Sequence, residues 1–228
     1  MRIEKLICGD AGHGGSDPGA VGHTPDGKRV EEKGVVLPVT LRMLEVLREH
    51  GVPTMATREI DVFVGLTERA RIANAAKAKL FISVHANSAD NRNATGIETF
   101  IFSRTTISQP WGQRVQDSMI SKFPGVPNRG LKKANFAVLR ETHMPACLAE
   151  LGFLSNPVEC ARLVDPATQE RFSMALAIAA LDTLGMVLVR QQEAASVPEC
   201  RIPIHDEMIE IADAQEEIVK RLRGLVAG

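Results

Sequence analysis

The sequence predicts an α/β fold, in which a single domain has a largely parallel central sheet with helices on both faces. Short apolar runs rich in strand-forming residues alternate with segments whose apolar residues recur at helical spacing. This alternation is typical of strand–helix–strand units whose strands lie parallel. The 228 residues are enough for one sizeable core, and a helical tail is expected after it.

Five runs are predicted to be strands, because each is apolar or β-branched and is bounded by polar or turn-forming residues. Together they should build the central sheet, with helices crossing between neighbouring strands. The five runs are Ile3–Cys8, Pro53–Ala56, Leu80–His85, Ile97–Phe102 and Ala146–Glu150.

Helices are predicted between these strands. The segment VVLPVTLRMLEVLREHG has apolar residues at helical spacing and ends at Gly51, which suits the position after a helix C-cap. The segment LTERARIANAAKA offers Thr67 as an N-cap and ends in a basic turn. Two further helices are expected over Gln109–Phe123 and Gln169–Leu184.

The pattern changes near Val189, which divides the chain into three predicted parts. Residues 1–189 form the predicted catalytic domain, and the polar, proline-containing residues 190–204 form a linker. Residues 205–228 form an amphipathic helix with acids early and basic residues late. This helix either docks on its own domain or pairs with a second copy or another chain, and both alternatives stay open.

Composition limits the classes of partner and the expected location. The 27 Lys+Arg balance 28 Asp+Glu, so the charge points to no nucleic-acid partner, and no apolar run approaches the roughly 20 residues of a membrane span. The N-terminus lacks the features of a signal peptide. Synthesis in the cytoplasm is therefore expected, the alternative being a secreted or periplasmic enzyme whose leader has been removed. The four cysteines show no CxxC spacing, which favours buried reduced thiols.

The stretch ICGDAGHGGSDPGA places His13 among glycines at the end of a predicted strand. Glycines permit a tight, exposed loop, so this histidine is positioned to contact something other than the core. Three other residues can reach the crevice at the carboxyl ends of the strands: Glu32, which opens the first long helix, and His85 and Glu150, which end strands.

Two histidines and one carboxylate with a fourth position open are the ligand set of a catalytic zinc site, and a second carboxylate can then manage protons. The wide spacing forms no local zinc motif, so structural roles for each residue remain an alternative at this point. Five segments decide between these alternatives. They are DAGHGGSDPGA, EEKGVVL, TREIDVFVGLTERARIANAAKAKLFISVHAN, GIETFIF and RGLKKANFAVLRETHMPACLAELGFLSNPVE.

In this order the five segments resemble the zinc-dependent N-acetylmuramoyl-L-alanine amidases, which cleave bacterial peptidoglycan. The resemblance runs from about Ile3 to Leu184. It implies one Zn²⁺ held by His13, Glu32 and His85, with Glu150 as the catalytic glutamate. The resemblance selects Glu32 and not the neighbouring Glu31 as the zinc ligand, because in the family this ligand directly precedes a lysine.

Three more residues are candidates for roles around this centre. Asp10 could accept the second imidazole N–H of His13 and fix its tautomer, or could cap a loop. Asn87 could orient substrate or close a turn, and Arg129 resembles a family position near the peptide-binding groove. The interval Ser103–Arg129 is too short for an added autoinhibitory helix, so an open site is expected.

The remaining polar residues and the single tryptophan suggest no further site. Arg58 and Asp61 should tie down the loop after the second strand, and Arg69 should pack or brace a loop. Trp111 is the one tryptophan and there is no tyrosine, so an aromatic surface for sugar stacking looks thin. The remaining histidines are not expected to bind a metal ion; they are His23, His50, His143 and His205.

The sequence therefore predicts an amidase that hydrolyses the bond between N-acetylmuramic acid and L-alanine in peptidoglycan, as in a phage or prophage lysin. Two alternatives stay open. One is a zinc peptidase acting on stem peptides. The other is a wall-binding or assembly component of a phage or injection particle, in which the C-terminal helix matters most.

Overall fold

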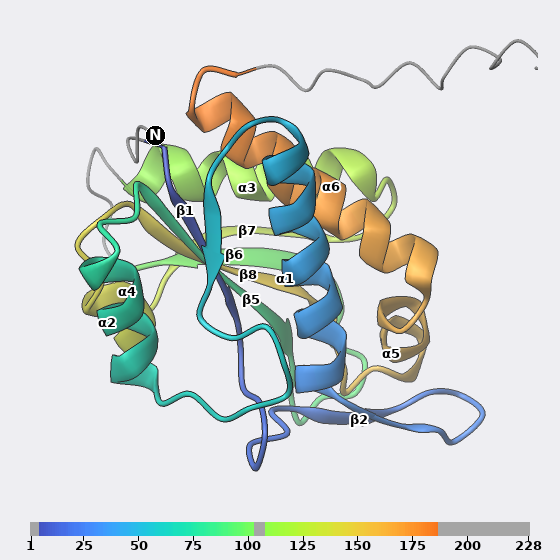
Figure 1. Ribbon diagram of the computed structural model, residues 1–228. Helices are drawn as coiled ribbons and strands as arrows, with labels where there is room; N and C mark the ends of the chain where they lie inside the picture. The colour runs from blue at the N-terminus through green and yellow to red at the C-terminus, as the bar shows by residue number, and fades with distance from the viewer. Residues whose placement is uncertain (1–4, 103–107, 187–228) are drawn as a thin grey trace, which may run out of the picture. The chain divides into compact units, whose positions relative to one another are not determined.

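A six-stranded sheet forms the centre of the protein, with strand order β4-β1-β5-β8-β6-β7 (Figure 1). The computed structural model describes residues 5–102 and 108–186. Every neighbouring pair in the sheet is parallel except β6 and β8, which are antiparallel. The strands are β1 (Ile7–Ala11), β4 (Thr54–Ala56), β5 (Leu80–Asn87), β6 (Ile97–Ile101), β7 (Asn128–Lys133) and β8 (Ala146–Phe153).

Helices cover both faces of this sheet, which confirms the predicted fold class (Figure 1). On one face lie α1 (Glu32–Glu49), α3 (Ser108–Lys122) and α6 (Pro166–Thr183). On the other lie α2 (Leu66–Ala75) and α4 (Ala137–Arg140). A short α5 (Pro157–Leu163) follows β8, and β2 (Val21–His23) pairs with β3 (Arg29–Glu31) in a separate antiparallel hairpin.

The side chains of β5 alternate between two hydrophobic cores. Leu80, Ile82 and Val84 belong to the larger core under α1, α3 and α6, and Phe81 belongs to the smaller core on the opposite face. A strand buried on both faces is apolar along its length, as expected for a parallel sheet. Beyond Phe81, the positions on its face become polar towards the carboxyl end of the strand. That end of the sheet carries the candidate site.

Several boundaries differ from the prediction. The first strand runs to Ala11, and β5 and β8 extend to Asn87 and Phe153, so the site residues lie within or directly beside strands. Thr67 is not the N-cap of α2; that position is Gly65, and no basic residue lies in the last turn. Gly51 has φ +75°, which confirms its place after the C-cap of α1.

Five short elements escaped prediction: β2, β3, β7, α4 and α5. Three-residue strands and a four-residue helix carry too few positions for a periodic pattern, and β7 is a polar edge strand. The predicted linker 190–204 and helix 205–228 lie outside the described residues, as does the boundary at residue 189. Among the described helices, none has the length and apolar character needed to cross a membrane.

The described cysteines match the expectation of buried thiols. Cys8, Cys147 and Cys160 are buried and form no disulfide, and burial raises the pKa of all three thiols. Cys200 lies outside the described residues.

Candidate metal centre

Three side chains from distant parts of the chain converge at the carboxyl edge of the sheet. His13 follows β1, Glu32 is the first residue of α1, and His85 lies near the end of β5. One donor atom from each lies within 4.8 Å of the other two. Glu32 Oε2 is 3.1 Å from His13 Nε2, and Glu32 Oε1 is 2.8 Å from His85 Nδ1. Two imidazoles and one carboxylate thus form a group that could hold a metal ion.

The carboxylate of Glu32 is held by the backbone on both sides. Its Oε2 accepts a hydrogen bond from the N–H of Ala20 at 2.8 Å, and its Oε1 accepts one from the N–H of Ala86 at 3.0 Å. Burial opposes the charged form, but hydrogen bonds to His13 and His85 outweigh it and hold the pKa of Glu32 well below its usual range. The side chain is therefore a fixed anion between the two rings.

Two glycines leave the space that these side chains occupy. A Cβ on Gly12 would lie 2.5 Å from His85 Nε2. A Cβ on Gly19, whose φ is +68°, would lie 2.6 Å from both Glu32 Oε2 and His13 Cδ2. Only a residue without a Cβ lets the backbone approach the three donors this closely. The glycine-rich loop is thus explained by the space that the donor group needs.

His13 forms its second hydrogen bond with the carboxylate of Asp17 and not with that of Asp10. His13 Nδ1 lies 2.8 Å from Asp17 Oδ2, and Asp17 Oδ1 also accepts from the N–H of Gly19 at 3.0 Å. Burial opposes protonation of His13, but the hydrogen bonds with Glu32 and Asp17 raise its pKa above the usual value. Asp17, which sequence reasoning missed, therefore orients this ring. Its position four residues after His13, in the same glycine-rich loop, was the sequence feature that could have identified it.

Asp10 was expected to orient His13 or to cap a loop, and both predictions are wrong. It lies within β1 with no exposed surface, because the strand is longer at this end than predicted. Its carboxylate accepts hydrogen bonds from Thr57 Oγ1 at 2.5 Å, Ser83 Oγ at 2.6 Å and Arg69 Nη1 at 2.7 Å. Burial raises the pKa of Asp10, but Arg69 and the two hydroxyls lower it by more, so the group is a buried anion.

Two buried arginines fix the backbone around His13. Arg58 donates to the carbonyls of Ala11 at 2.9 Å and Gly12 at 2.8 Å. Arg69 donates to the carbonyls of Ala11 and His13, both at 2.6 Å. Arg69 thus braces a loop, as predicted. Arg58 also donates to the carbonyl of Ile60 at 3.2 Å, within the loop that it was predicted to tie down. This support matters because His13 itself has φ +59°, a conformation that non-glycine residues adopt at a cost.

Glu150 stands beside the donor group on the neighbouring strand. In the sheet it pairs with His85 of β5 on one side and with Glu98 of β6 on the other, and directly paired residues share a face. Its Oε2 is buried and has no hydrogen-bond partner among the described residues. Burial, together with the charges of Glu32 and Glu98, raises the pKa of Glu150 well above its usual value.

Asn87 and Arg129 meet at Glu98, a residue that sequence reasoning did not single out. Asn87 Nδ2 donates to Glu98 Oε1 at 2.6 Å, and Arg129 Nε donates to Glu98 Oε2 at 2.8 Å. Lys132 of β7 also pairs with this carboxylate, and the Arg129 guanidinium lies over the Phe153 ring at 4.8 Å. A lone acid inside the apolar run IETFIF was the signal that could have identified Glu98.

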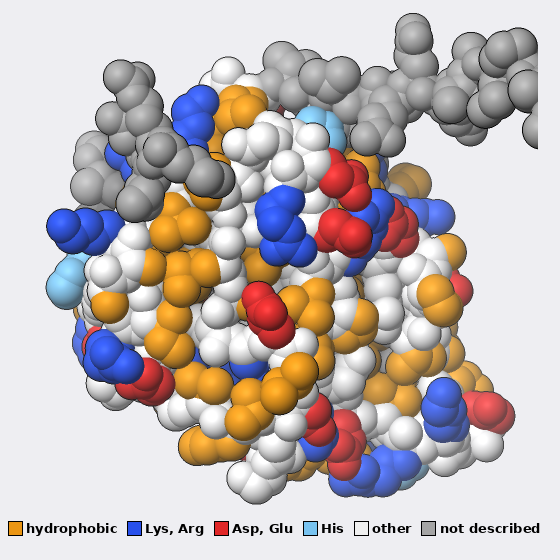
Figure 2. All heavy atoms as spheres, viewed as in Figure 1, with side chains coloured by type: hydrophobic (Ala, Val, Ile, Leu, Met, Phe, Trp, Pro, Cys, Tyr) orange, Lys and Arg blue, Asp and Glu red, His pale blue; other side chains and the backbone are white. Residues whose placement is uncertain are grey.

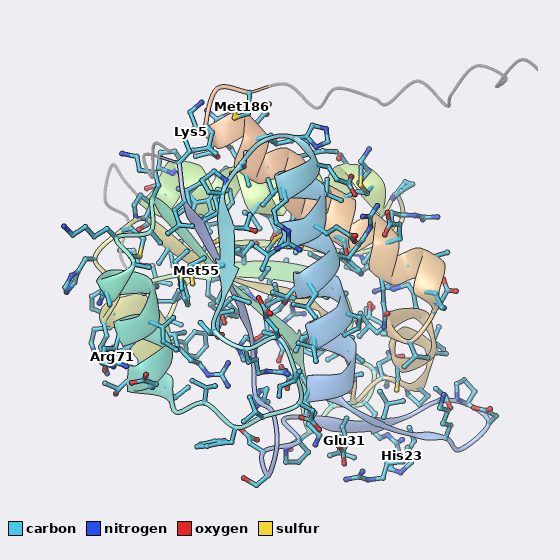
Figure 3. The ribbon with its side chains drawn as sticks, viewed as in Figure 1. Lys5, His23, Glu31, Met55, Arg71 and Met186 are labelled. Carbon is cyan, nitrogen blue, oxygen red and sulfur yellow. The ribbon has the colours of Figure 1, made fainter. Side chains whose placement is uncertain are left out.

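Glu31 lies apart from the donor group, in β3 at the hairpin where Figure 3 also labels His23. It forms ion pairs with Arg29 and Lys33, so the choice of Glu32 over Glu31 agrees with the geometry. His23, His50 and His143 are not part of the donor group, and His205 lies outside the described residues. Within residues 108–129, α3 is the only helix, so the described part of this interval holds no added one.

Residues 7–181 match the family described as N-acetylmuramoyl-L-alanine amidase. The chain is 39% identical over 167 residues to an endolysin of Bacillus phage SPP1, covering 71% of this chain and 59% of that protein. It is 34% identical over 157 residues to a probable cell wall amidase LytH of Staphylococcus epidermidis, covering 68% of this chain and 50% of that protein.

A solved structure gives the same result for the fold. The amidase AmiC2 of Nostoc punctiforme superimposes with a TM-score of 0.74 at 34% sequence identity, covering 80% of this chain and 98% of that chain.

The buried pair of Asp10 and Arg69 predicts a large loss of stability on substitution. Asp10→Asn leaves Arg69 buried without its anion, so the free energy of unfolding at pH 7 should fall by about 3–5 kcal/mol. Because the folded pKa of Asp10 is lowered, its contribution is present above the unfolded value near 3.8 and is lost as the pH falls below it. The difference between variant and wild type should therefore shrink in acid.

Urea denaturation at pH 7 and at several lower pH values measures this difference. Asp182→Asn on the exposed end of α6 is the control and should change stability by about 0.5 kcal/mol at most. An Asp10→Asn protein as stable as this control would show that the pair does not support the loop.

Proposed function

The chain belongs to the N-acetylmuramoyl-L-alanine amidase family, and from this and its site we propose that it hydrolyses the amide between N-acetylmuramic acid and L-alanine in peptidoglycan. The observation that carries the proposal is the position of Glu150 on β8, directly paired with His85. It is a buried carboxylate, and one of its oxygens has no hydrogen-bond partner among the described residues. A proton-transfer group therefore stands beside a donor group suited to a metal ion.

We propose that His13, Glu32 and His85 hold one Zn²⁺. Two imidazole nitrogens and one carboxylate oxygen, with a further position open, are a donor set of catalytic zinc sites. The space left by Gly12 and Gly19 around these atoms supports the same assignment. When bound, zinc lowers the pKa of a coordinated water towards ~7 and polarises the substrate carbonyl.

The proton transfers fall to Glu150. Its Oε2, which has no hydrogen-bond partner in the described part of the chain, is the atom to take a proton from the attacking water and to return it to the departing amide nitrogen. Burial raises the pKa of Glu150, so this group takes up a proton more readily than an exposed glutamate does. Its place within β8 gives it a rigid support.

Asn87 and Arg129 are proposed to bind the stem peptide. Both contact Glu98 next to Glu150, and the side chains of Arg129 and Lys132 are 35% and 38% exposed. Two cations against one buried carboxylate leave a net positive charge at this end of the site. Stem peptides carry carboxylates, so this charge suits the peptide arm of the substrate.

The place of this activity in a cell is also a proposal. Similarity to a phage endolysin supports a lysin that acts on the cell wall, and similarity to a probable cell wall amidase supports a wall enzyme of a bacterium. Pairing through residues 205–228, or a role of these residues in an assembly, stays a prediction because they lie outside the described residues.

Glu150→Gln should remove hydrolysis while leaving the donor group intact. The rate on purified sacculi should fall by about 10²–10⁴-fold, because glutamine cannot take a proton, and the zinc content should be unchanged. Glu170→Gln on α6, at a position about half exposed, is the matched control and should retain wild-type activity.

Mass spectrometry of the wild-type products tests the bond that is cut. New free amino groups on L-alanine with intact lactyl groups are expected. Cleavage between amino acids would instead identify a peptidase, and near-full activity of a zinc-loaded Glu150→Gln protein would remove Glu150 from the mechanism.

Gly12→Ala should weaken zinc binding by displacing the His85 ring. We expect the affinity for zinc to fall by about 10–100-fold, as for changes that disturb the support of a metal ligand. Gly34→Ala is the control, because a Cβ there meets nothing within 4 Å. Competition with a zinc-binding dye measures both affinities, and equal affinities for the two variants would contradict this assignment.

A further inference from the structure

The segment joining β4 to α2, together with the first residue of α2, exposes an unusual run of apolar side chains. Ile60, Val62, Phe63 and Leu66 are 69%, 43%, 55% and 60% exposed, and we name residues 60–66 the apolar loop. Hydrophobic side chains gather on the lower part of the face in Figure 2, where this segment runs in Figure 1. Single exposed apolar residues are common, but four within seven positions form a patch of the kind that marks a binding surface.

The apolar loop is held in a fixed conformation. Arg58 donates to the carbonyl of Ile60 at 3.2 Å, and Arg69 donates to the carbonyl of Val64 at 2.8 Å. Asp61 accepts from the N–H of Gly15 at 2.7 Å and pairs with Lys33 at 2.8 Å. The polar groups of the loop are thus used for anchoring, while the apolar side chains point to solvent. A surface presented in this way needs little ordering when a ligand binds.

This loop is continuous with the metal centre. A Cβ on Gly15, two residues after His13, would lie 2.6 Å from the backbone nitrogen of Phe63 and 3.3 Å from its Cβ. A Cβ on Gly14 would overlap the carbonyl oxygen of Val62. Arg69 joins the two loops further, since it donates to the carbonyls of both His13 and Val64. A ligand at the donor group therefore has the apolar loop directly beside it.

The strand order gives the site two different ends. The apolar loop follows β4, at one edge of the sheet, and His13 follows β1 beside it. Next come His85 on β5 and Glu150 on β8, and the order ends with Glu98 on β6 and Lys132 on β7. The donor group and Glu150 thus stand between an apolar end and a charged end.

We propose that the apolar loop binds the glycan arm of the substrate, with Phe63 against a sugar ring, while the peptide arm runs towards Arg129 and Lys132. This inference rests on the proposed function, and it states on which side of the donor group each arm of the substrate lies. The scissile amide joins a sugar to a peptide, so the two arms must leave the donor group in different directions. A pyranose ring offers a C–H face that packs on apolar and aromatic side chains, whereas a stem peptide offers carboxylates to cations.

The charges on the loop favour a glycan over an anionic membrane. Glu59 and Asp61 are the exposed charged residues next to the apolar ones in this segment, and both are acidic. Arg58 is buried. Attachment to an anionic lipid surface relies on exposed basic residues next to the apolar ones. A neutral sugar imposes no such requirement.

The test measures how the full chain, loaded with zinc, cleaves two different substrates. One is a disaccharide carrying the stem peptide, and the other is the same peptide capped with a lactyl group and lacking sugars. Phe63→Ala should lower kcat/KM for the disaccharide substrate by about tenfold, through KM, because partial burial of a phenylalanine is lost. The lactyl peptide should be cleaved as by the wild type. Val158→Ala, at a position 73% exposed on α5, is the matched control and should change neither substrate.

A second measurement uses glycan strands from which the peptides have been removed. They should inhibit the wild type competitively and should inhibit Phe63→Ala about tenfold less. Equal losses on both substrates, or equal inhibition, would overturn the inference alone. A Phe63→Ala protein that cleaves both substrates as the wild type does but no longer binds phosphatidylglycerol vesicles would also overturn the inference alone. A wild-type protein that cleaves neither substrate would overturn the proposed function as well.

Discussion

The carboxylate of Glu32 is the interaction on which the site depends. It lies at the first residue of α1, contacts both imidazoles, and accepts hydrogen bonds from the backbone of Ala20 and Ala86. One buried anion thereby joins the first helix, the glycine-rich loop after β1 and the end of β5. Its charge is favoured by these partners in spite of burial, as the lowered pKa shows.

The topology of the sheet explains why three acids lie near one another without forming one cluster of ligands. Because β6 runs antiparallel to β8, the beginning of β6 lies at the same edge as the end of β8, and Glu98 comes to lie beside Glu150. Glu98 is paired with Arg129 and Lys132, and Glu32 is hydrogen-bonded to His13 and His85. Glu150 alone lacks a cationic partner among the described residues, so it is the acid with a raised pKa.

The sequence predicted the fold and the converging residues well, because strand and helix alternate clearly and carboxyl ends of parallel strands meet at one edge. It failed where local patterns are short or where a partner is distant. The strand that contains Asp10 ends later than predicted, so this residue faces Arg69 in the interior and Asp17 takes the place beside His13. The exposure of the apolar loop was also beyond prediction, because a sequence does not show which apolar residues of a loop face solvent.

The central claim is that two imidazoles and one carboxylate hold zinc beside Glu150. X-ray absorption at the zinc edge of the purified, zinc-loaded protein tests it most directly. The account predicts a first shell of nitrogen and oxygen at about 2.0–2.2 Å with the outer scattering of two imidazole rings. Sulfur at about 2.3 Å, or a first shell without imidazole, would contradict it.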